Sequence, residues 1–240
     1  MSFVWHTFFF DPIYNGLVFF IDVIPGGDVG LSIVAITLVV KFILLPLSLK
    51  ASRMQKIVKE LEPKMTEIKE RHKDDREALA RATMGVYKEA GINPFSGIFL
   101  MLLQIPIVIA LYFSVSTGGG IPLPGINGDL LYSFVPSPST IDMIFLGFVN
   151  IAMNSWPLAV LAGATQFIHA KLSLPTPEPK KEGVVSMKDD FARSMHLNMR
   201  YVLPVMIGVI AYTLSASVAL YFTVSNLFAI AQELLIRRRA

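Results

Sequence analysis

The chain has no cysteine and few charged residues for its length. Without cysteine there is no disulfide framework, no thiolate metal site and no lipid-modified cysteine. Charged residues make up 16% of the 240 residues, whereas an ordinary soluble domain has about 25%. Hydrophobic residues make up 53%, and one globule of this size cannot bury that much apolar surface. The composition therefore excludes a soluble or disordered protein and predicts contact with lipid.

Basic residues are missing from two long stretches, 1–29 and 115–155, which carry acidic residues only. Of the 21 lysines and arginines, eleven lie in 50–88, six in 171–200 and three at the C-terminal end. The remaining one is Lys41, inside an apolar run. Because cytoplasmic loops carry an excess of Lys and Arg, the basic segments are expected in the cytoplasm and the two acidic stretches outside.

Five apolar runs, each near the ~20 residues that cross a bilayer, predict an all-α integral membrane protein. Five transmembrane helices would place the N-terminus outside and the C-terminus in the cytoplasm, in agreement with the charges. The predicted division is an outer interfacial amphipathic helix (1–29), five spans (30–49, 93–115, 156–172, 199–214 and 215–236), a cytoplasmic helical hairpin (50–92), an outer loop (116–155), a cytoplasmic loop (173–198) and a basic cytoplasmic tail (237–240). Residues 213–217 are expected to form a tight turn between the last two spans.

The aromatic-rich segment 1–29 lacks the basic region of a signal peptide. Its uninterrupted apolar stretch, 16–21, is too short to span a membrane. One helical face would carry Ile13, Leu17, Phe20 and Ile24, which is typical of a helix lying on the membrane surface. The alternative, a sixth span, would place the N-terminus inside with no basic residue to hold it there.

The basic segment 50–92 predicts a helical hairpin, because apolar residues recur every three or four positions on both arms. The first arm carries Met54, Ile57, Leu61, Met65 and Ile68, and the return arm carries Leu79, Ala82 and Val86. Pro63 is expected to bend the first arm, and Asp74 to cap the second helix. The basic face suits anionic lipid headgroups, RNA or acidic proteins, and the alternative is a loop that only enforces topology. The residues expected to contact lipid or a protein on which this chain acts are Arg53, Lys56, Lys59, Lys73 and Arg76.

Lys41 lies about eight residues before the cytoplasmic end of the first predicted span, or ~12 Å deep. A lysine near mid-bilayer costs at least ~2.5 kcal/mol. The other predicted spans hold no Asp or Glu before Glu233, so we expect Lys41 to face a water-filled groove. Uncharged polar residues expected in the spans around it are Thr37, Gln104, Thr165, Gln166, Ser225 and Asn226.

The sequence predicts no enzyme, because the spans carry no pair of carboxylates and the chain shows no Gly-rich phosphate loop after a strand. No metal-ligand spacing is present, so no metal or cofactor is expected. Two alternatives stay open: a small-solute transporter with a polar site at mid-membrane, and a structural or lipid-active membrane protein. Five unequal spans do not suggest the inverted repeats common in transporters, and a structural role would leave Lys41 unexplained.

Four stretches, covering about residues 30–239, resemble the YidC-type membrane protein insertase family (YidC/Oxa/Alb) in its bacterial short form. They are Thr37-Leu-Val-Val-Lys41-Phe-Ile-Leu-Leu-Pro46-Leu; Leu61-Glu-Pro63-Lys64; Tyr87-Lys-Glu-Ala-Gly-Ile-Asn93-Pro94-Phe95-Ser-Gly97, continuing through Gln104-Ile-Pro106-Ile and Ala110-Leu-Tyr112; and Ala219-Leu-Tyr221-Phe222-Thr-Val-Ser225-Asn226-Leu227. The resemblance implies a polar groove that holds a positive charge and opens to the cytoplasm and lipid. Lys41 stands where the family usually has arginine, and Tyr221-Phe222 matches the aromatic pair of its last span.

The resemblance also implies the activity: an insertase and chaperone that takes hydrophilic segments of nascent membrane proteins into the groove and releases their hydrophobic segments into lipid. The expected partners are these clients, anionic lipids, and the Sec translocon, ribosome and signal recognition particle pathway. No sequence-specific nucleic acid binding is expected. The expected location is the cell inner membrane, as a multi-pass protein.

Overall fold

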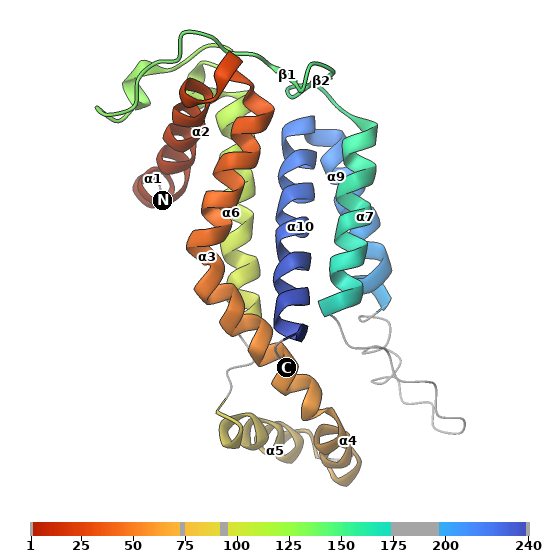
Figure 1. Cartoon of the computed structure of the whole chain (residues 1–240). Coiled ribbons are helices and arrows are strands. Elements are labelled where there is room, and N and C mark those ends of the chain that lie inside the picture. Colours follow the sequence, from red (N-terminus) through yellow and green to blue (C-terminus); the bar gives the residue numbers. More distant parts are fainter. Residues whose placement is uncertain (1, 73–74, 92–95, 174–196, 239–240) are drawn as a thin grey trace. The chain divides into compact units, whose positions relative to one another are not determined.

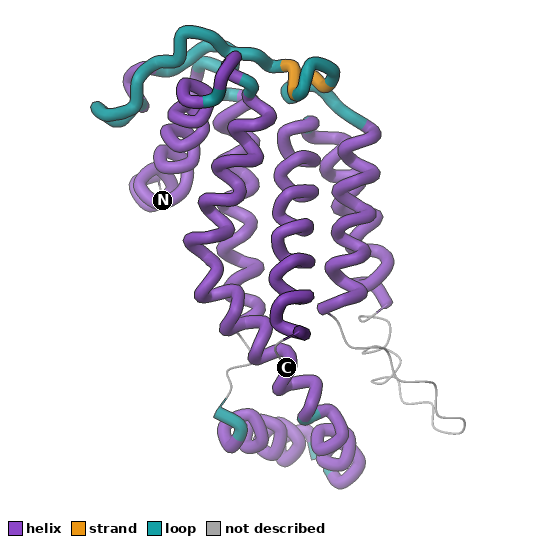
Figure 2. Tube along the Cα trace, viewed as in Figure 1, coloured by secondary structure: helices purple, strands orange, loops and turns teal. Residues whose placement is uncertain are grey.

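The computed structural model is mostly helical and describes residues 2–72, 75–91, 96–173 and 197–238 (Figures 1 and 2). Its elements are α1 (Ser2–Trp5), π-helical η1 (His6–Phe10), α2 (Asp11–Val23), η2 (Pro25–Gly27), α3 (Val29–Glu60), α4 (Glu62–Arg71), α5 (Arg76–Glu89), α6 (Ser96–Ser116), η3 (Gly118–Gly120), η4 (Gly128–Leu130), β1 (Ile144–Phe145), β2 (Val149–Asn150), α7 (Trp156–Ser173), π-helical η5 (Asn198–Val202), α9 (Leu203–Leu214) and α10 (Ala216–Arg238). The short antiparallel pair β1–β2 is a departure from the predicted all-α class.

Two compact units make up the chain: Met1–Ile43 with Ile105–Ala240, and Leu44–Gln104. In the first unit α7 packs against both α9 and α10, and the three helices lie side by side (Figure 1). The ring of Phe42 on α3 meets that of Phe228 on α10 edge to face, with centroids 5.2 Å apart. This contact joins α3 to the same group of helices.

Two helical segments among the described residues are long and apolar enough to cross a membrane by length and composition: Val29–Met54 and Ala216–Ile236. Leu102–Ser116 and Asn198–Leu214 are shorter apolar helices. The number of spans and their orientation therefore stay predictions.

The turn between α9 and α10 is shorter than the predicted 213–217. Ser215 alone separates the two helices, in an extended conformation. Backbone hydrogen bonds connect this turn to the segment before α7. The N–H of Ala216 donates to the carbonyl of Met153 at 2.7 Å. The N–H of Ser217 likewise donates to the carbonyl of Ile151 at 3.1 Å.

The N-terminal helix was predicted to place one apolar face on the membrane surface. Of the residues on that face, Ile13 and Leu17 are buried in the protein, and Phe20 and Ile24 are half-buried. The buried face also runs through Phe10, Tyr14, Val18 and Ile21, which follow the same helical period at a rotated angle. Phe10, Tyr14 and Val18 pack with Val135, so this face meets protein rather than the membrane surface.

Polar contacts secure this packing. The Nδ2 of buried Asn15 donates to the carbonyl of Leu130 at 2.9 Å, and its Oδ1 accepts from the N–H of Tyr132 at 2.7 Å. Burial raises the pKa of the Tyr14 hydroxyl, and the N–H of Asn127, which donates to that oxygen at 2.8 Å, partly opposes the rise. The loop after α6 is therefore fastened to α2 at several points.

Buried Asp28 joins the start of α3 to the β1–β2 turn. Its Oδ1 accepts from the N–H of Leu31 and its Oδ2 from the N–H of Leu146, both at 2.9 Å. Leu146 has a positive φ of 51°, which is uncommon for a residue other than glycine. Nearby, Gly30 lies against the ring of Phe145, where an added Cβ would lie only 2.3 Å from the nearest ring atom.

The second unit holds the end of α3, α4 and α5. The first predicted arm breaks at Leu61, and Pro63 sits in the first turn of α4, where its missing N–H costs no helical hydrogen bond. Asp75, not the predicted Asp74, caps α5: its carboxylate accepts from the N–H groups of Glu77 and Ala78, each at 2.9 Å. Asp74 itself lies outside the described residues.

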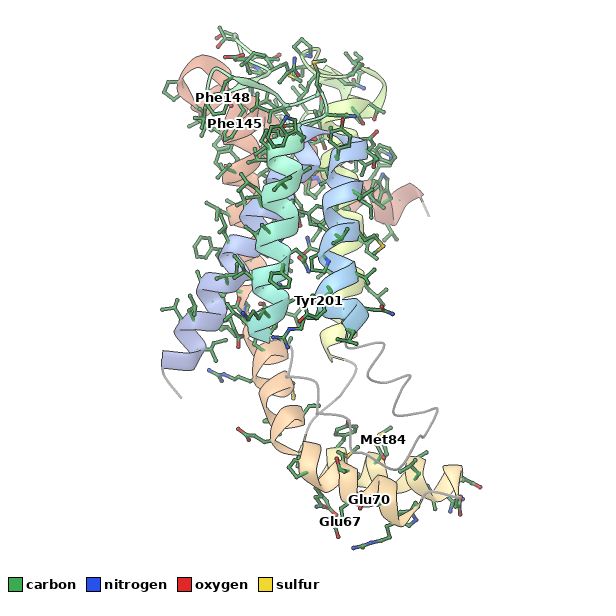
Figure 3. The ribbon with its side chains drawn as sticks, turned by 90° about the vertical axis from the view of Figure 1, so that its right-hand side faces the viewer. Glu67, Glu70, Met84, Phe145, Phe148 and Tyr201 are labelled. Atoms are coloured by element: carbon green, nitrogen blue, oxygen red, sulfur yellow. The ribbon has the colours of Figure 1, made fainter. Side chains whose placement is uncertain are left out.

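Helices α4 and α5 pack against each other, and Lys64 pairs with Glu89 across them at 3.1 Å. Figure 3 labels Glu67 and Glu70 on α4 and Met84 on α5. Val86 is buried, while the other predicted seam residues are half-buried. The seam is therefore thin, as its spacing predicts.

Candidate functional site

The cation predicted inside the membrane, Lys41, is half-buried on α3. Counting from Val29, it is the 13th of the 26 residues in the apolar segment Val29–Met54. It interacts electrostatically with His169 of α7. A lysine on α3 and a histidine on α7 therefore lie close enough to interact.

Thr37, one turn before Lys41, is buried and shares a small cavity with Tyr221 of α10. The cavity has a volume of about 10 Å³, the space of a single water molecule. Apolar side chains from α2, α3 and α6 line the rest: Ile13, Ile36, Val40, Ile107 and Leu111. The Thr37 hydroxyl donates to the carbonyl of Ile33 at 2.6 Å, so its hydrogen bond is made within α3.

The interior is thus tightly packed at Thr37, on the Val29 side of Lys41. Lys41 lines neither this cavity nor the larger one between α7 and α9 described below. A hydrated groove around Lys41 accordingly stays a prediction.

A polar contact joins α10 to α7. The Nδ2 of buried Asn226 donates to the Oγ1 of Thr165 at 3.2 Å and to the carbonyl of Ala162 at 3.3 Å. On the same helix, Tyr221 and Ser225 interact through their side chains one turn apart, and both are buried. Buried polar groups therefore lie along α10 from Tyr221 to Asn226.

The predicted groove residues divide into three groups. Thr37, Tyr221 and Ser225 are buried in the interior of the first unit. Gln166 is half-buried on α7, and its place in a groove stays a prediction. Gln104 belongs to the second unit and is described with it, so its membership also stays a prediction.

The sequence placed polar residues in two adjacent pairs, Thr165 with Gln166 and Ser225 with Asn226. Thr165 and Asn226 make the hydrogen bond between α7 and α10, while the candidate groove set held Gln166 and Ser225. His169 was not in that set, although it is a lone histidine inside an apolar run. Adjacent helical residues point about 100° apart, and an apolar sequence all round leaves that rotation open.

The predicted contact residues of the hairpin belong to the second unit. Arg53 is exposed on α3. Lys56 and Lys59 lie on α3 and Arg76 opens α5, and only their backbones are described. Lys73 lies outside the described residues. Nothing in the second unit tests what these residues contact.

Within the described ranges, no group of three or more His, Asp or Glu residues could hold a metal ion. The polar side chains described above are a lysine and a histidine that are half-buried, and hydroxyls and an amide that are buried.

The fold and this site define a helical membrane protein with a cation within an apolar helix. A family model described as 60Kd inner membrane protein matches residues 20–240, and the chain belongs to this family. The match confirms the predicted family and its membrane localisation.

Several similar proteins are each named membrane protein insertase YidC. One from Fusobacterium nucleatum is 32% identical over 213 residues, which cover 89% of this chain and 88% of that protein. One from Halalkalibacterium halodurans, numbered YidC 1, is 29% identical over 233 residues. These residues cover 95% of this chain and 77% of that protein. One from Pelobacter propionicus is 28% identical over 98% of this chain, which spans only 39% of that longer protein.

Proposed function

We propose that this protein is a membrane protein insertase. It would take hydrophilic segments of nascent membrane proteins into a polar groove at Lys41 and release their hydrophobic segments into lipid. The observation that carries this proposal is a half-buried lysine at the middle of a long apolar helix. The family and the names of the relatives support the same activity.

The physical basis is the cost of holding polar groups at membrane depth. A charged side chain at the bilayer centre costs about 2.5–3.5 kcal/mol on insertion scales, and an unsatisfied amide or hydroxyl costs several more in an apolar medium. A cation and hydrogen-bonding side chains in the groove lower this cost for an acidic or polar client segment. Partition of the client's hydrophobic segment into lipid then drives the step without a nucleotide.

Five spans with the N-terminus outside and the C-terminus in the cytoplasm complete the proposal. In this orientation the packed layer of Thr37 and Tyr221 lies on the outer side of Lys41. A space of about 10 Å³ admits no peptide, which supports a groove closed toward the outside. Access to Lys41 then comes from the cytoplasm or from lipid.

The basic hairpin, 50–92, would serve recruitment at the cytoplasmic surface. Arg53, Lys56, Lys59, Lys73 and Arg76 are proposed to contact clients and anionic lipids, at about 1 kcal/mol for each basic residue near the membrane. Delivery through the ribosome, the signal recognition particle or the Sec translocon fits the same surface.

Reconstitution tests the proposal directly. The full chain in liposomes should protect a newly made, small client with a short acidic outer segment from external protease, well above empty liposomes. A matched preparation of Lys41→Ala should protect less. Protection no better than empty liposomes, with the protein folded, would overturn the proposal, and uptake of a small solute in its place would favour the transporter.

A further inference from the structure

Helices α7 and α9 enclose an elongated apolar groove in the first unit, with a volume of about 760 Å³. Gly163 of α7 and Gly208 of α9 belong to its lining and lie against each other. A Cβ added to Gly163 would lie 3.2 Å from the carbonyl oxygen of Pro204 and 3.7 Å from the Cα of Gly208. The absence of side chains at these two positions therefore makes the groove.

Aromatic residues mark both ends. Exposed Trp156 and Tyr212 stand at one end, where α7 begins and α9 finishes. The rings of Phe167 and Tyr201 pair at the other, with centroids 5.8 Å apart. Figure 3 shows Tyr201 at the end of the bundle opposite Phe145 and Phe148. From Trp156 to Phe167 the groove is about 16 Å long, close to the ~15 Å hydrocarbon depth of one leaflet.

The volume suits a chain thinner than a helix. A spanning helix is about 10 Å wide and ~30 Å long, several times larger than 760 Å³. A flexible hydrocarbon chain fits both the length and the apolar lining.

Among the residues that the structure describes, cationic side chains stand at the Tyr201 end of this groove. Arg200 precedes Tyr201 on η5, and exposed Lys171 lies near the end of α7, which packs against η5. The Nε of Arg200 is shielded from solvent and has no hydrogen-bond acceptor within the described part of the chain. A buried guanidinium donor without an acceptor is costly, and a phosphate oxygen is the acceptor that arginine binds best.

We propose that the groove between α7 and α9 binds an anionic phospholipid, with its phosphate on Arg200 and Lys171 and an acyl chain along the groove. This inference rests on the proposed five-span topology, which puts Arg200 and Lys171 at the cytoplasmic leaflet. The bound lipid would fill the space beside the close approach of Gly163 and Gly208, and would fix the separation of α7 and α9 beside α10.

The test is a lipid titration of the purified full chain in detergent micelles, read by native mass spectrometry. The probes are phosphatidylglycerol, which is anionic, and phosphatidylcholine, which has no net charge. The wild type should bind phosphatidylglycerol at least tenfold more tightly. Arg200→Gln should remove most of this preference, and Arg200→Lys should retain part of it, because lysine keeps the charge but loses the planar fork.

A second variant tests the groove without altering charge. Ala164 lines it and is exposed, so Ala164→Phe should fill it and weaken binding of both lipids about tenfold. Ala231→Phe, on an exposed site of α10, is the matched control for size and should bind like the wild type.

Equal binding of the two lipids, unchanged by Arg200→Gln and Ala164→Phe, would overturn the proposal and indicate only a general lipid coat. Occupation of the groove by a second copy or a client peptide in place of lipid would overturn it too. The titration contains no client and no bilayer, so loss of insertion leaves its result intact. A reversed topology would appear in labelling experiments while lipid binding persisted.

Discussion

The Nδ2 of Asn226 on α10 donates to the Oγ1 of Thr165 on α7 at 3.2 Å, and both residues are buried. The two residues are 61 positions apart in sequence, and their hydrogen bond joins two helices. In an apolar environment such a bond fixes the rotation of each helix about its axis, because the alternative leaves two polar groups without partners.

The coupling between these two residues is measurable by a double-mutant cycle. Thr165→Val and Asn226→Ala, alone and together, should give a coupling of about 0.6 kcal/mol in the free energy of unfolding, with ~1.7 as an upper value. Unfolding in detergent with denaturant supplies the four values. Asn198→Ala, at an exposed site on η5, is the control and should change stability little. Additive effects of the two substitutions would show that the bond contributes nothing.

A second prediction concerns Asp28, which accepts from the N–H groups of Leu31 and Leu146. Asp28→Ala should lower the free energy of unfolding by about 1–2 kcal/mol, as the loss of a helix N-cap does. It should also release the β1–β2 turn, measured as faster proteolysis within 144–150. Asp28→Asn keeps one acceptor oxygen and should lose less. Asp129→Ala, in an exposed part of the loop, should leave both measurements unchanged.

Apolar runs predicted a helical membrane protein, and four sequence stretches that resemble the insertase family predicted the family. Helix rotation was not predictable. Thr165 with Gln166 and Ser225 with Asn226 were predicted as adjacent polar pairs, and the apolar sequence around them does not decide which member of each pair faces the neighbouring helix. The N-terminal helix shows the same limit, since Ile13 and Leu17, predicted to face the membrane surface, are buried in the protein.

Contacts between distant segments were also beyond sequence reasoning. Asp28 and Leu146 are 118 residues apart, and an aspartate just before an apolar run gives no sign that it will be buried. The predicted N-cap of α5 was wrong by one residue for a local reason. Asp74 and Asp75 are adjacent, and either could precede the helix.

Lys41 should be accessible to water from the cytoplasmic side. The chain has no cysteine, so Lys41→Cys introduces a single reactive thiol. A membrane-impermeant thiol reagent should label it in inside-out vesicles and not from the outside. Leu227→Cys, at an exposed apolar site of α10 expected to face lipid, should label poorly from either side. Labelling of position 41 from outside only would reverse the proposed orientation of the groove.

The charge of Lys41 should matter more than its hydrogen-bond geometry. A moving client presents varied groups, and a positive charge attracts its acidic segment in any orientation. Lys41→Arg should therefore preserve insertion in liposomes, and Lys41→Ala should weaken it for clients with acidic outer segments. Clients with uncharged outer segments are the internal control and should be affected less. Equal insertion of acidic clients by wild type and Lys41→Ala would remove the charge from the mechanism.

The last prediction concerns the hairpin. Its apolar seam is thin, and Arg71 and Arg81 form exposed ion pairs with Glu67 and Glu77, which contribute little to stability. We therefore expect its function to depend on surface charge, with binding to anionic vesicles that weakens as salt rises. Deleting the tip, 72–76, should reduce insertion more than it reduces the amount of protein in the membrane.

A second variant separates this role from a purely topological one. Neutralising Arg53, Lys56 and Lys59 to glutamine leaves the tip in place and tests the positive charge beside the membrane. If recruitment is the role, this variant should insert clients poorly while position 41 keeps its sidedness of labelling. If the tip deletion inserts clients normally while the neutralised hairpin inverts that labelling, the segment is only a topological anchor. The two readouts differ because recruitment depends on a surface that the client meets, whereas topology depends on where the positive charges lie along the chain.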